Sequence, residues 1–311
     1  VKKGVVIGVE NETNNQINLL NIACNNVDIP VYFSPSETSI VGKGNKYLIN
    51  NFVYGLVMDD MSDDSEYKTV IDIEAVDLVP KKLDKLIPDL PPMDTWVNVK
   101  DFGAVGDGKT DDTQAIKEAI AKHKNVYLPS GWYRVTEPLK LNKGNALIGL
   151  HPFATQLVLA ESEANFSGFG SPVPVLESSE GGDDIINGIG IKTGGYNNRA
   201  VGLKWMASEH SMINDVKFVG GHGTMAKPGQ PSHSRRRDQN ISSPSEPVYS
   251  QGMDLAWDNQ YWSLWVTNNG GGTLKDIWTA NTYASAGLYI SNTATPGKIY
   301  AMSLEHHVRQ E

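Results

Sequence analysis

The sequence has little cysteine, no long apolar run and no clustered metal ligands. Its single cysteine, Cys24, excludes an internal disulfide framework and a cysteine-based zinc site, and it is interpreted as a small buried apolar side chain. No apolar run is long enough to cross a bilayer. Three histidines near predicted turns, His210, His222 and His233, show no metal-ligand spacing. We therefore expect no cofactor, no metal and no membrane partner.

Positive charge is also scarce. The 27 Lys and Arg residues stand against 36 Asp and Glu, which gives a formal net charge of −9. Such a chain has no general affinity for nucleic-acid backbones, so no nucleic-acid partner is expected. The chain also lacks an initial Met and a signal peptide, and strand-like sequence reaches both ends. We expect it to be a piece of a longer protein, and the composition leaves the oligomeric state open.

Glycine is abundant, with 30 residues, and together with Asn and Thr it separates short apolar runs. This pattern is typical of strands joined by tight turns. Residues 1–78 are predicted to be a β-rich segment, the end of a preceding β-helix or other β-domain. Residues 79–95 concentrate four prolines among charged residues and are predicted to be a stiff linker. Residues 96–311 form the second predicted domain, truncated at its C-terminus.

The second domain opens with a strand, a glycine-rich turn and a helix. WVNVKDF alternates as a strand does, and Asp111, Asp112 and Thr113 offer N-cap groups and the negative charge that a helix start favours. Four apolar residues follow at helical spacing: Ala115, Ile116, Ala119 and Ile120. A short helix is therefore predicted directly after the turn.

Residues 103–110 of this turn match the nucleotide-binding P-loop pattern, Gly, four residues, Gly-Lys-Thr. Two observations argue against a nucleotide site. Asp111 and Asp112 place negative charge where phosphates would lie at the helix N-terminus. No alternation of strands and helices follows, although a nucleotide-binding parallel sheet requires one. We therefore interpret the turn as structural.

The same segment, NVKDFGAVGDGKTDDTQAIKEAI followed by VYLPSGWYRV, closely resembles the opening motif of the pectate-lyase-like β-helix superfamily. There, the strand, turn and helix cap the first coil, so that its open backbone edge pairs with no other chain. The resemblance implies an all-β fold, a right-handed parallel β-helix with a short N-terminal capping helix, preceded here by the β-rich segment. Asp107, Asp111 and Asp112 are then structural caps. Short strands after residue 144 fit the coils, and residues 220–251 are predicted to be a long loop.

The last strand-like run, KIYAMSLEHHVRQE, is the predicted site. Strand side chains alternate. One face of the run is mostly apolar and is expected to face the core: Tyr300, Met302, Leu304, His306 and Val308. The opposite face then carries a row of polar groups: Ser303, Glu305, His307, Arg309 and Glu311. Such a row suits a substrate groove, although a solvated strand face with internal charge pairing would look the same.

A second resemblance bears on this strand. Family 55 exo-β-1,3-glucanases carry a Ser-Glu-His segment followed shortly by Val, and residues 304–308, LEHHV, resemble it with Leu in place of Ser. The resemblance implies that Glu305 matches a conserved active-site glutamate and that the general acid lies on a following coil. Glu311 stands where that family tends to have Gln.

Glu305 needs a second carboxyl group at the right distance. Inverting glycosidases hold their two carboxyls ~6.5–9.5 Å apart, whereas Glu305 and Glu311 would be roughly 20 Å apart on an extended strand. The partner could come from Asp254, Asp258 or Glu209, or from sequence beyond this chain. Trp262 or Tyr261 could stack on a sugar ring, within an aromatic group that also includes Trp257 and Trp265. His307, Arg309 and Glu311 are predicted to bind substrate, together with Asp254, Asp258 and Trp262.

Three functions are open at this point. The leading prediction is a secreted, periplasmic or cell-surface glycoside hydrolase that cleaves a polysaccharide or oligosaccharide, with Glu305 as its catalytic residue. The second resemblance implies a β-glucan as the substrate. A polysaccharide lyase would need an acidic sugar, a basic residue and often calcium, and Arg309 and residues 235–237 could bind such a sugar. A tailspike-like glycan-binding β-helix would have a polar and aromatic face without a close carboxyl pair.

Overall fold

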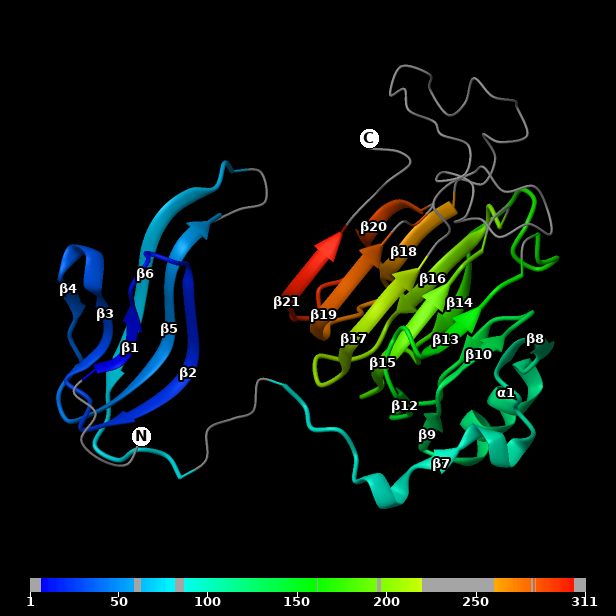
Figure 1. The fold of residues 1–311 in the computed structure, drawn as a ribbon, viewed down its shortest axis with the longest axis horizontal. Coiled ribbons are helices and arrows are strands. Elements are labelled where there is room, and N and C mark those ends of the chain that lie inside the picture. The colour runs from blue at the N-terminus through cyan, green and yellow to red at the C-terminus, as the bar shows by residue number, and fades with distance from the viewer. Residues whose placement is uncertain are drawn as a thin grey trace. The chain divides into compact units, whose positions relative to one another are not determined.

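The computed structural model describes residues 7–58, 63–81, 87–160, 162–194, 197–219, 260–280, 282 and 284–304 of the 311. The chain forms two compact units, Val1–Leu86 and Ile87–Glu311 (Figure 1). The boundary falls within the proline-rich segment 79–95, in whose described part the only regular element is the 3-10 turn η2 (Met93–Thr95). The domain limits drawn from the sequence stay a proposal, and the predicted loop 220–251 lies outside the described residues.

The first unit contains two three-stranded sheets. One joins β1 (Ile7–Asn11), β3 (Ile29–Phe33) and β4 (Thr38–Ile40), with the turn η1 (Ser34–Ser36), and the other joins β2 (Ile17–Asn25), β5 (Lys46–Val57) and β6 (Glu66–Ala75). β1 and β3 pair in parallel, whereas the other described pairings are antiparallel, unlike the pairing of β-helix coils. Cys24 is buried in the core of this unit, as predicted.

The second unit is built of short strands that wind in coils. Its described elements after η2 are β7 (Val97–Asn98), η3 (Val99–Phe102), β8 (Asp107–Asp111), α1 (Thr113–Lys122), β9 (Asn125–Leu128), β10 (Gly131–Arg134), β11 (Leu139–Lys140), β12 (Ala146–Gly149), β13 (Thr155–Val158), β14 (Val173–Glu177), β15 (Ile185–Lys192), β16 (Ala200–Trp205), β17 (Met212–Val219), β18 (Gln260–Val266), β19 (Gly272–Ala280), β20 (Ala284–Ile290) and β21 (Gly297–Leu304).

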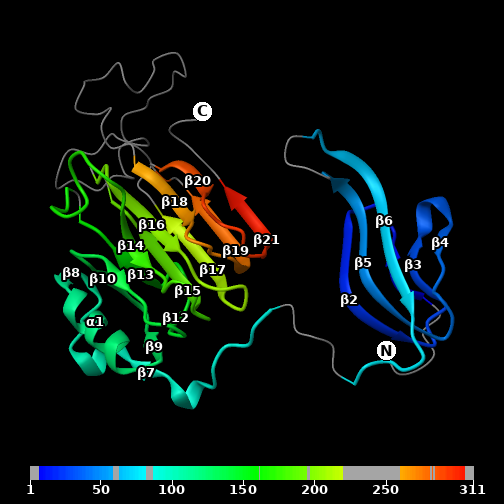
Figure 2. The same cartoon turned by 180° about the vertical axis from the view of Figure 1, so that it is seen from behind.

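These strands form two parallel sheets. The five-stranded sheet has the order β11-β14-β16-β18-β20, and the ten-stranded sheet runs β7-β9-β12-β15-β17-β19-β21, with β8, β10 and β13 beside its early strands. Figure 2 shows the strands of successive coils stacked from β9 to β21, with α1 at the first coil. The second unit is a right-handed parallel β-helix with a capping helix, as the sequence predicts.

The core of the β-helix repeats from coil to coil because parallel strands in register stack like residues above each other. In the five-stranded sheet, one column consists entirely of leucines, four of them fully buried and the last partly buried. We call it the leucine column: Leu139, Leu176, Leu203, Leu264 and Leu288. This column packs the inner face of the sheet.

The long strands of the ten-stranded sheet bend at one residue each. Gly188, Asp215, Asp276 and Ala301 occupy matching places in β15, β17, β19 and β21, and all have positive φ, namely 67°, 49°, 52° and 51°. A left-handed residue turns the strand and interrupts the alternation of its side chains. The prediction that Tyr300 faces the core is therefore wrong. Ile299 stands in register with buried Leu274, and after the bend Met302 packs on the core.

The opening segment forms a cap held by three carboxylates. Asp107 accepts hydrogen bonds from the backbone N–H groups of Lys109 and Thr110, at 2.8 and 2.7 Å, and Asp112 accepts from Val105 and Gly106, at 2.6 and 3.1 Å. These carboxylates occupy backbone donors that a P-loop would offer to phosphates. The structural role predicted for these aspartates is confirmed, and their hydrogen bonds argue against the nucleotide interpretation.

Asp111 and Asp112 differ in their electrostatics. Burial would raise the pKa of Asp111, but hydrogen bonds from the hydroxyl and N–H of Thr113 outweigh it and hold this pKa below its usual value. Burial raises the pKa of Asp112, which the N–H donors of Val105 and Gly106 offset only in part. Asp111, not the residue directly before α1, thus supplies the side-chain cap of the helix.

Candidate functional site

The five-stranded sheet presents chemically varied side chains directly beside the leucine column. The residue after each leucine points to the opposite face of its strand. These residues are in register across five strands, half-buried or exposed, and we call them the outer column: Lys140, Glu177, Lys204, Trp265 and Tyr289. The outer column carries charge at its β11 end and aromatic rings at its β20 end.

The charged part of the outer column is an ion-pair chain. The carboxylate of Glu177 lies 3.6 Å from Nζ of Lys140 and 4.0 Å from Nζ of Lys204. Lys204 in turn places its ammonium 5.2 Å from the ring centroid of Trp265. The side chains of Glu177 and Lys204 are only 17 % and 19 % exposed, so these contacts are less screened than those of an ordinary surface pair. Charge and aromatic surface are therefore physically linked.

The aromatic part is a cluster from β18 and β20, which we call the aromatic cluster: Tyr261, Trp262, Trp265 and Tyr289. Trp262 stacks on Tyr289 with ring centroids 4.2 Å apart and an interplanar angle of 20°. Two anchors fix the cluster: the Tyr261 hydroxyl donates to the Gly170 carbonyl at 2.8 Å, and Trp265 Nε1 donates to Ser291 Oγ at 2.9 Å. Tyr289 remains 39 % exposed. A flat ring held in place beside charged groups suits stacking against a sugar.

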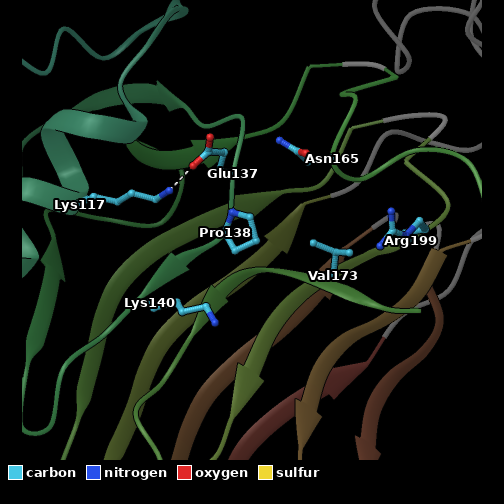
Figure 3. Close-up of a pocket in the computed structure, with 7 residues that line it drawn as sticks. All are labelled: Lys117, Glu137, Pro138, Lys140, Asn165, Val173 and Arg199. Atoms are coloured by element: carbon cyan, nitrogen blue, oxygen red, sulfur yellow. Dashed lines mark hydrogen bonds and ion pairs between the residues drawn. The ribbon is translucent and has the colours of Figure 1, made fainter. Parts of the chain in front are cut away.

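An open pocket of about 450 Å³ lies at the other end of the outer column. Its lining, drawn in Figure 3, comes from α1, β11, the start of β14 and the connections that precede β11, β14 and β16: Lys117, Glu137, Pro138, Lys140, Asn165, Val173 and Arg199. We call it the cationic pocket, because it has three basic residues and one acidic residue. Lys140 belongs to both the pocket and the outer column, so the two features are continuous.

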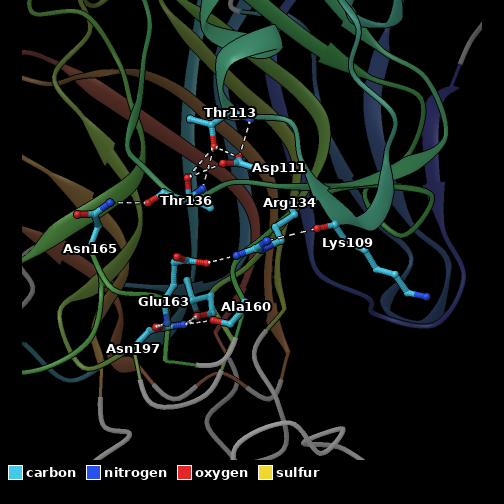
Figure 4. Close-up of polar contacts among 10 residues, drawn as sticks. Lys109, Asp111, Thr113, Arg134, Thr136, Ala160, Glu163, Asn165 and Asn197 are labelled. Atoms are coloured by element: carbon cyan, nitrogen blue, oxygen red, sulfur yellow. Dashed lines mark hydrogen bonds and ion pairs between the residues drawn. The ribbon is translucent and has the colours of Figure 1, made fainter.

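A polar network supports one wall of the pocket (Figure 4). Asn165 donates through its side-chain amide to the Thr136 carbonyl at 2.8 Å, and the Thr136 hydroxyl donates to Asp111 at 2.9 Å. On the same connection, Glu163 pairs with Arg134 at 3.0 Å and is only 10 % exposed. The segment that carries Asn165 is thereby tied to the opening cap, which explains how a connection between strands keeps a defined wall.

Most of the residues predicted for the site fall outside the described part of the chain. These are Glu305, His307, Arg309, Glu311, Asp254 and Asp258, and their roles stay predictions. Trp262 is described, and it lies in the aromatic cluster. Glu209 lies in an exposed turn after β16, where it contacts His210 at 3.6 Å, and it is not part of the outer column.

Sequence reasoning missed Glu177, Lys204 and Tyr289. Each follows directly after a leucine in a short β run, and that alternation was a usable signal. What the alternation could not give is the register, because it does not say which run stacks on which. The cationic pocket had no local signal at all, since its lining comes from five separate stretches of the chain.

Among the residues that the structure describes, no group of three or more His, Cys, Asp or Glu residues could hold a metal ion. No helix within the same ranges is long and apolar enough to cross a membrane.

Residues 96–300 match the sequence profile of the family described as "Rhamnogalacturonase A/epimerase, pectate lyase-like". The chain belongs to this family. The match begins at the strand before the opening cap and extends into β21, and so includes the outer column, the aromatic cluster and the cationic pocket. Its members are carbohydrate-active β-helix proteins.

The names of curated relatives of this chain indicate that they act on different glycans. Alginate lyase 7 of Azotobacter vinelandii is 36% identical over 138 residues, which are 43% of this chain and 15% of that protein. A probable glucan endo-1,3-beta-glucosidase of Arthroderma benhamiae is 31% identical over 140 residues, or 41% of this chain and 15% of that protein. The matches thus span only a small part of the relatives' length.

Among solved structures, the surface adhesin PfbA of Streptococcus pneumoniae is similar to the chain. It shares 21% sequence identity with a TM-score of 0.35, and the match covers 69% of this chain and 57% of that one.

Proposed function

We propose that the chain is part of a secreted or cell-surface glycoside hydrolase that binds a polysaccharide or oligosaccharide along the outer face of the five-stranded sheet. The observation that supports it most is the aromatic cluster beside the outer column, with Trp262 stacked on Tyr289 at 4.2 Å. Glycan sites combine flat apolar surface with a few placed polar groups. The family and its glucosidase relative support a carbohydrate substrate.

The chemistry we propose is general acid–base hydrolysis by two carboxyl groups, one of them Glu305. Glu177 is a poor candidate for the second, because two lysines already hold its carboxylate. We assign Glu177 to substrate positioning, where its pairing keeps Lys140 and Lys204 extended along the sheet. The second carboxyl group would then come from another coil.

A lyase or epimerase that acts on an acidic glycan is the second candidate. Two observations favour it: the three basic residues of the cationic pocket, and the similarity to alginate lyase 7. Either reaction would begin with loss of the proton on the carbon beside a uronate carboxyl group. A nearby cation would stabilise the negative charge that then develops on this carboxyl group. A lyase would leave an unsaturated uronide, whereas a hydrolase would not.

The test is to incubate the full chain with β-1,3-glucan, alginate and polygalacturonate, and to measure reducing ends and the ultraviolet absorbance of unsaturated uronides. A hydrolase releases reducing ends without that absorbance, and Glu305→Gln should lower the rate about 100-fold or more, the usual scale for general acid–base groups. Glu118→Gln, which alters an exposed carboxylate of α1 paired with Lys122, is the control. Product with the absorbance would favour the lyase, and binding without any product would favour a glycan-binding β-helix.

A further inference from the structure

We propose that the cationic pocket is a subsite for an anionic substituent, a carboxylate or sulfate, on the glycan that lies along the five-stranded sheet. This inference rests on the proposed function for the presence of a glycan. It adds a second recognition site, at the opening cap, to the aromatic cluster of the later coils. Its volume of about 450 Å³ is in the range of small-ligand pockets, ~300–1,000 Å³.

The lining of the pocket combines the groups that a sugar ring with a charged substituent would need. Figure 3 shows Lys117 and Glu137 on one side, Arg199 on the other, and Pro138 and Val173 between them. The two apolar side chains offer a surface to a ring, while the basic residues stand at its edges. This arrangement is typical of sites that bind a polar ligand in one orientation.

The pocket is positively charged, although the chain as a whole is negatively charged. Lys117, Lys140 and Arg199 stand against Glu137 alone, whereas the whole chain has a formal net charge of −9. Glu137 contacts Lys117, and Lys140 reaches Glu177 at 3.6 Å. Arg199 has no ion pair with the described residues, so an anion in the pocket would meet an uncompensated guanidinium.

Arg199 is also held in position. Its Nε donates to the Ser171 carbonyl at 3.0 Å, and among the described residues its terminal amino groups make no hydrogen bond. A fixed guanidinium with two available amino groups can bind a carboxylate or sulfate in a two-pronged geometry. Arg199 is therefore the main proposed contact, with Lys117 and Lys140 as additional charges.

The pocket lies where a bound glycan could extend. Lys140 begins the outer column on β11, and Tyr289 ends it on β20, four strand spacings away. At ~4.8 Å per spacing this is roughly 19 Å, a distance that a short oligosaccharide can cover. One glycan could thus stack on the aromatic cluster and place an anionic group in the pocket.

The experiment measures binding by calorimetry with three probes: a galacturonate oligosaccharide, its carboxyl-reduced neutral counterpart and a sulfated galactan oligosaccharide. At least one anionic probe should bind about tenfold more tightly than the neutral one, as one charge-assisted hydrogen bond provides. Arg199→Ala should remove most of that roughly tenfold preference and Lys117→Ala a smaller part, about threefold, while both leave neutral binding within about twofold. Comparing the two anionic probes tells whether carboxylate or sulfate is preferred.

Lys100→Ala is the matched control, because it removes one exposed positive charge from the same unit outside the pocket. Arg199→Lys is the second variant, in case Arg199→Ala folds poorly. It retains the positive charge without the two-pronged geometry, so its affinity for the anionic probe should lie between those of the unmodified chain and Arg199→Ala. Equal affinity for all probes, or equal losses from Lys100→Ala and Arg199→Ala, would overturn the inference. A pocket-dependent preference in a chain that hydrolyses nothing would support it while refuting the proposed function.

Discussion

Two neighbouring columns of the five-stranded sheet, one residue apart in every strand, show how this β-helix separates folding from function. The leucine column repeats one residue type over five coils, and four of its five leucines are fully buried. The outer column has no repeat and changes from lysine and glutamate to tryptophan and tyrosine. Stacking in the core demands the same shape at each level, whereas the solvent face carries no such demand. Chemical variety can therefore accumulate there without cost to the fold.

The largest expected effect is on stability, from a mutation in the leucine column. Leu203→Ala removes a fully buried side chain between Leu176 and Leu264 and should lower the free energy of unfolding by about 2–5 kcal/mol. Chemical denaturation of the variant measures it. Leu288→Ala, at a partly buried position of the same column, should cost less. Equal losses of unfolding free energy at both positions would mean that burial does not determine how much the leucine column contributes to stability.

A mutation of the outer column should affect glycan binding more than stability. Tyr289→Ala removes the exposed partner of Trp262 and should weaken binding of a neutral glucan oligosaccharide about tenfold, while the free energy of unfolding falls by ~0.5–1.5 kcal/mol, as for one aromatic pair. Calorimetry and denaturation of the same sample report both. Tyr127→Ala, which affects a Trp96 contact at the first coil, is the aromatic control. Unchanged glucan affinity would show that the aromatic cluster is only structural.

The charged part of the outer column should contribute less to stability. Glu177→Gln leaves Lys140 and Lys204 without their carboxylate and should cost at most about 1 kcal/mol, since Lys140 is 69 % exposed. A double-mutant cycle with Lys204→Met isolates the ion pair. A coupling free energy well above that value would indicate that the partly buried pair matters for folding, and would weaken the comparison of the columns.

The smallest effect concerns pH and the opening cap. The pKa of Asp111 is lower in the folded than in the unfolded chain, so its stabilising effect is present above the unfolded value of about 3.9 and is lost as pH falls through the folded value. Asp111→Asn should therefore flatten the acid side of the stability profile. Thermal unfolding between neutral and acid pH measures this. An equally steep loss of stability in acid would assign the pH dependence to other carboxylates.

The opening cap shows how far local sequence can lead. Gly103, with φ of 92°, ends the turn η3, and the carboxylates of Asp107 and Asp112 bind backbone N–H groups within a few residues of themselves. Such contacts join residues close along the chain, so the turn and the helix were predictable from local sequence, while the role of the aspartates was implied by the resemblance to the β-helix superfamily. Alternation in short runs likewise predicted most strands, but it failed at Ala301, because a left-handed residue inside a strand reverses the faces that follow.

The candidate site was less predictable, since its residues meet only when coils stack. Glu177 and Lys204 are 27 residues apart, and Trp265 is separated from Lys204 by a long stretch that no spacing rule describes. The sequence by itself determined the short strands, the turn and the helix of the cap, because these follow from residues close along the chain, and its opening motif indicated the parallel β-helix through a family resemblance. Only the tertiary structure decided the outer column and the cationic pocket, because register between coils sets which distant side chains become neighbours.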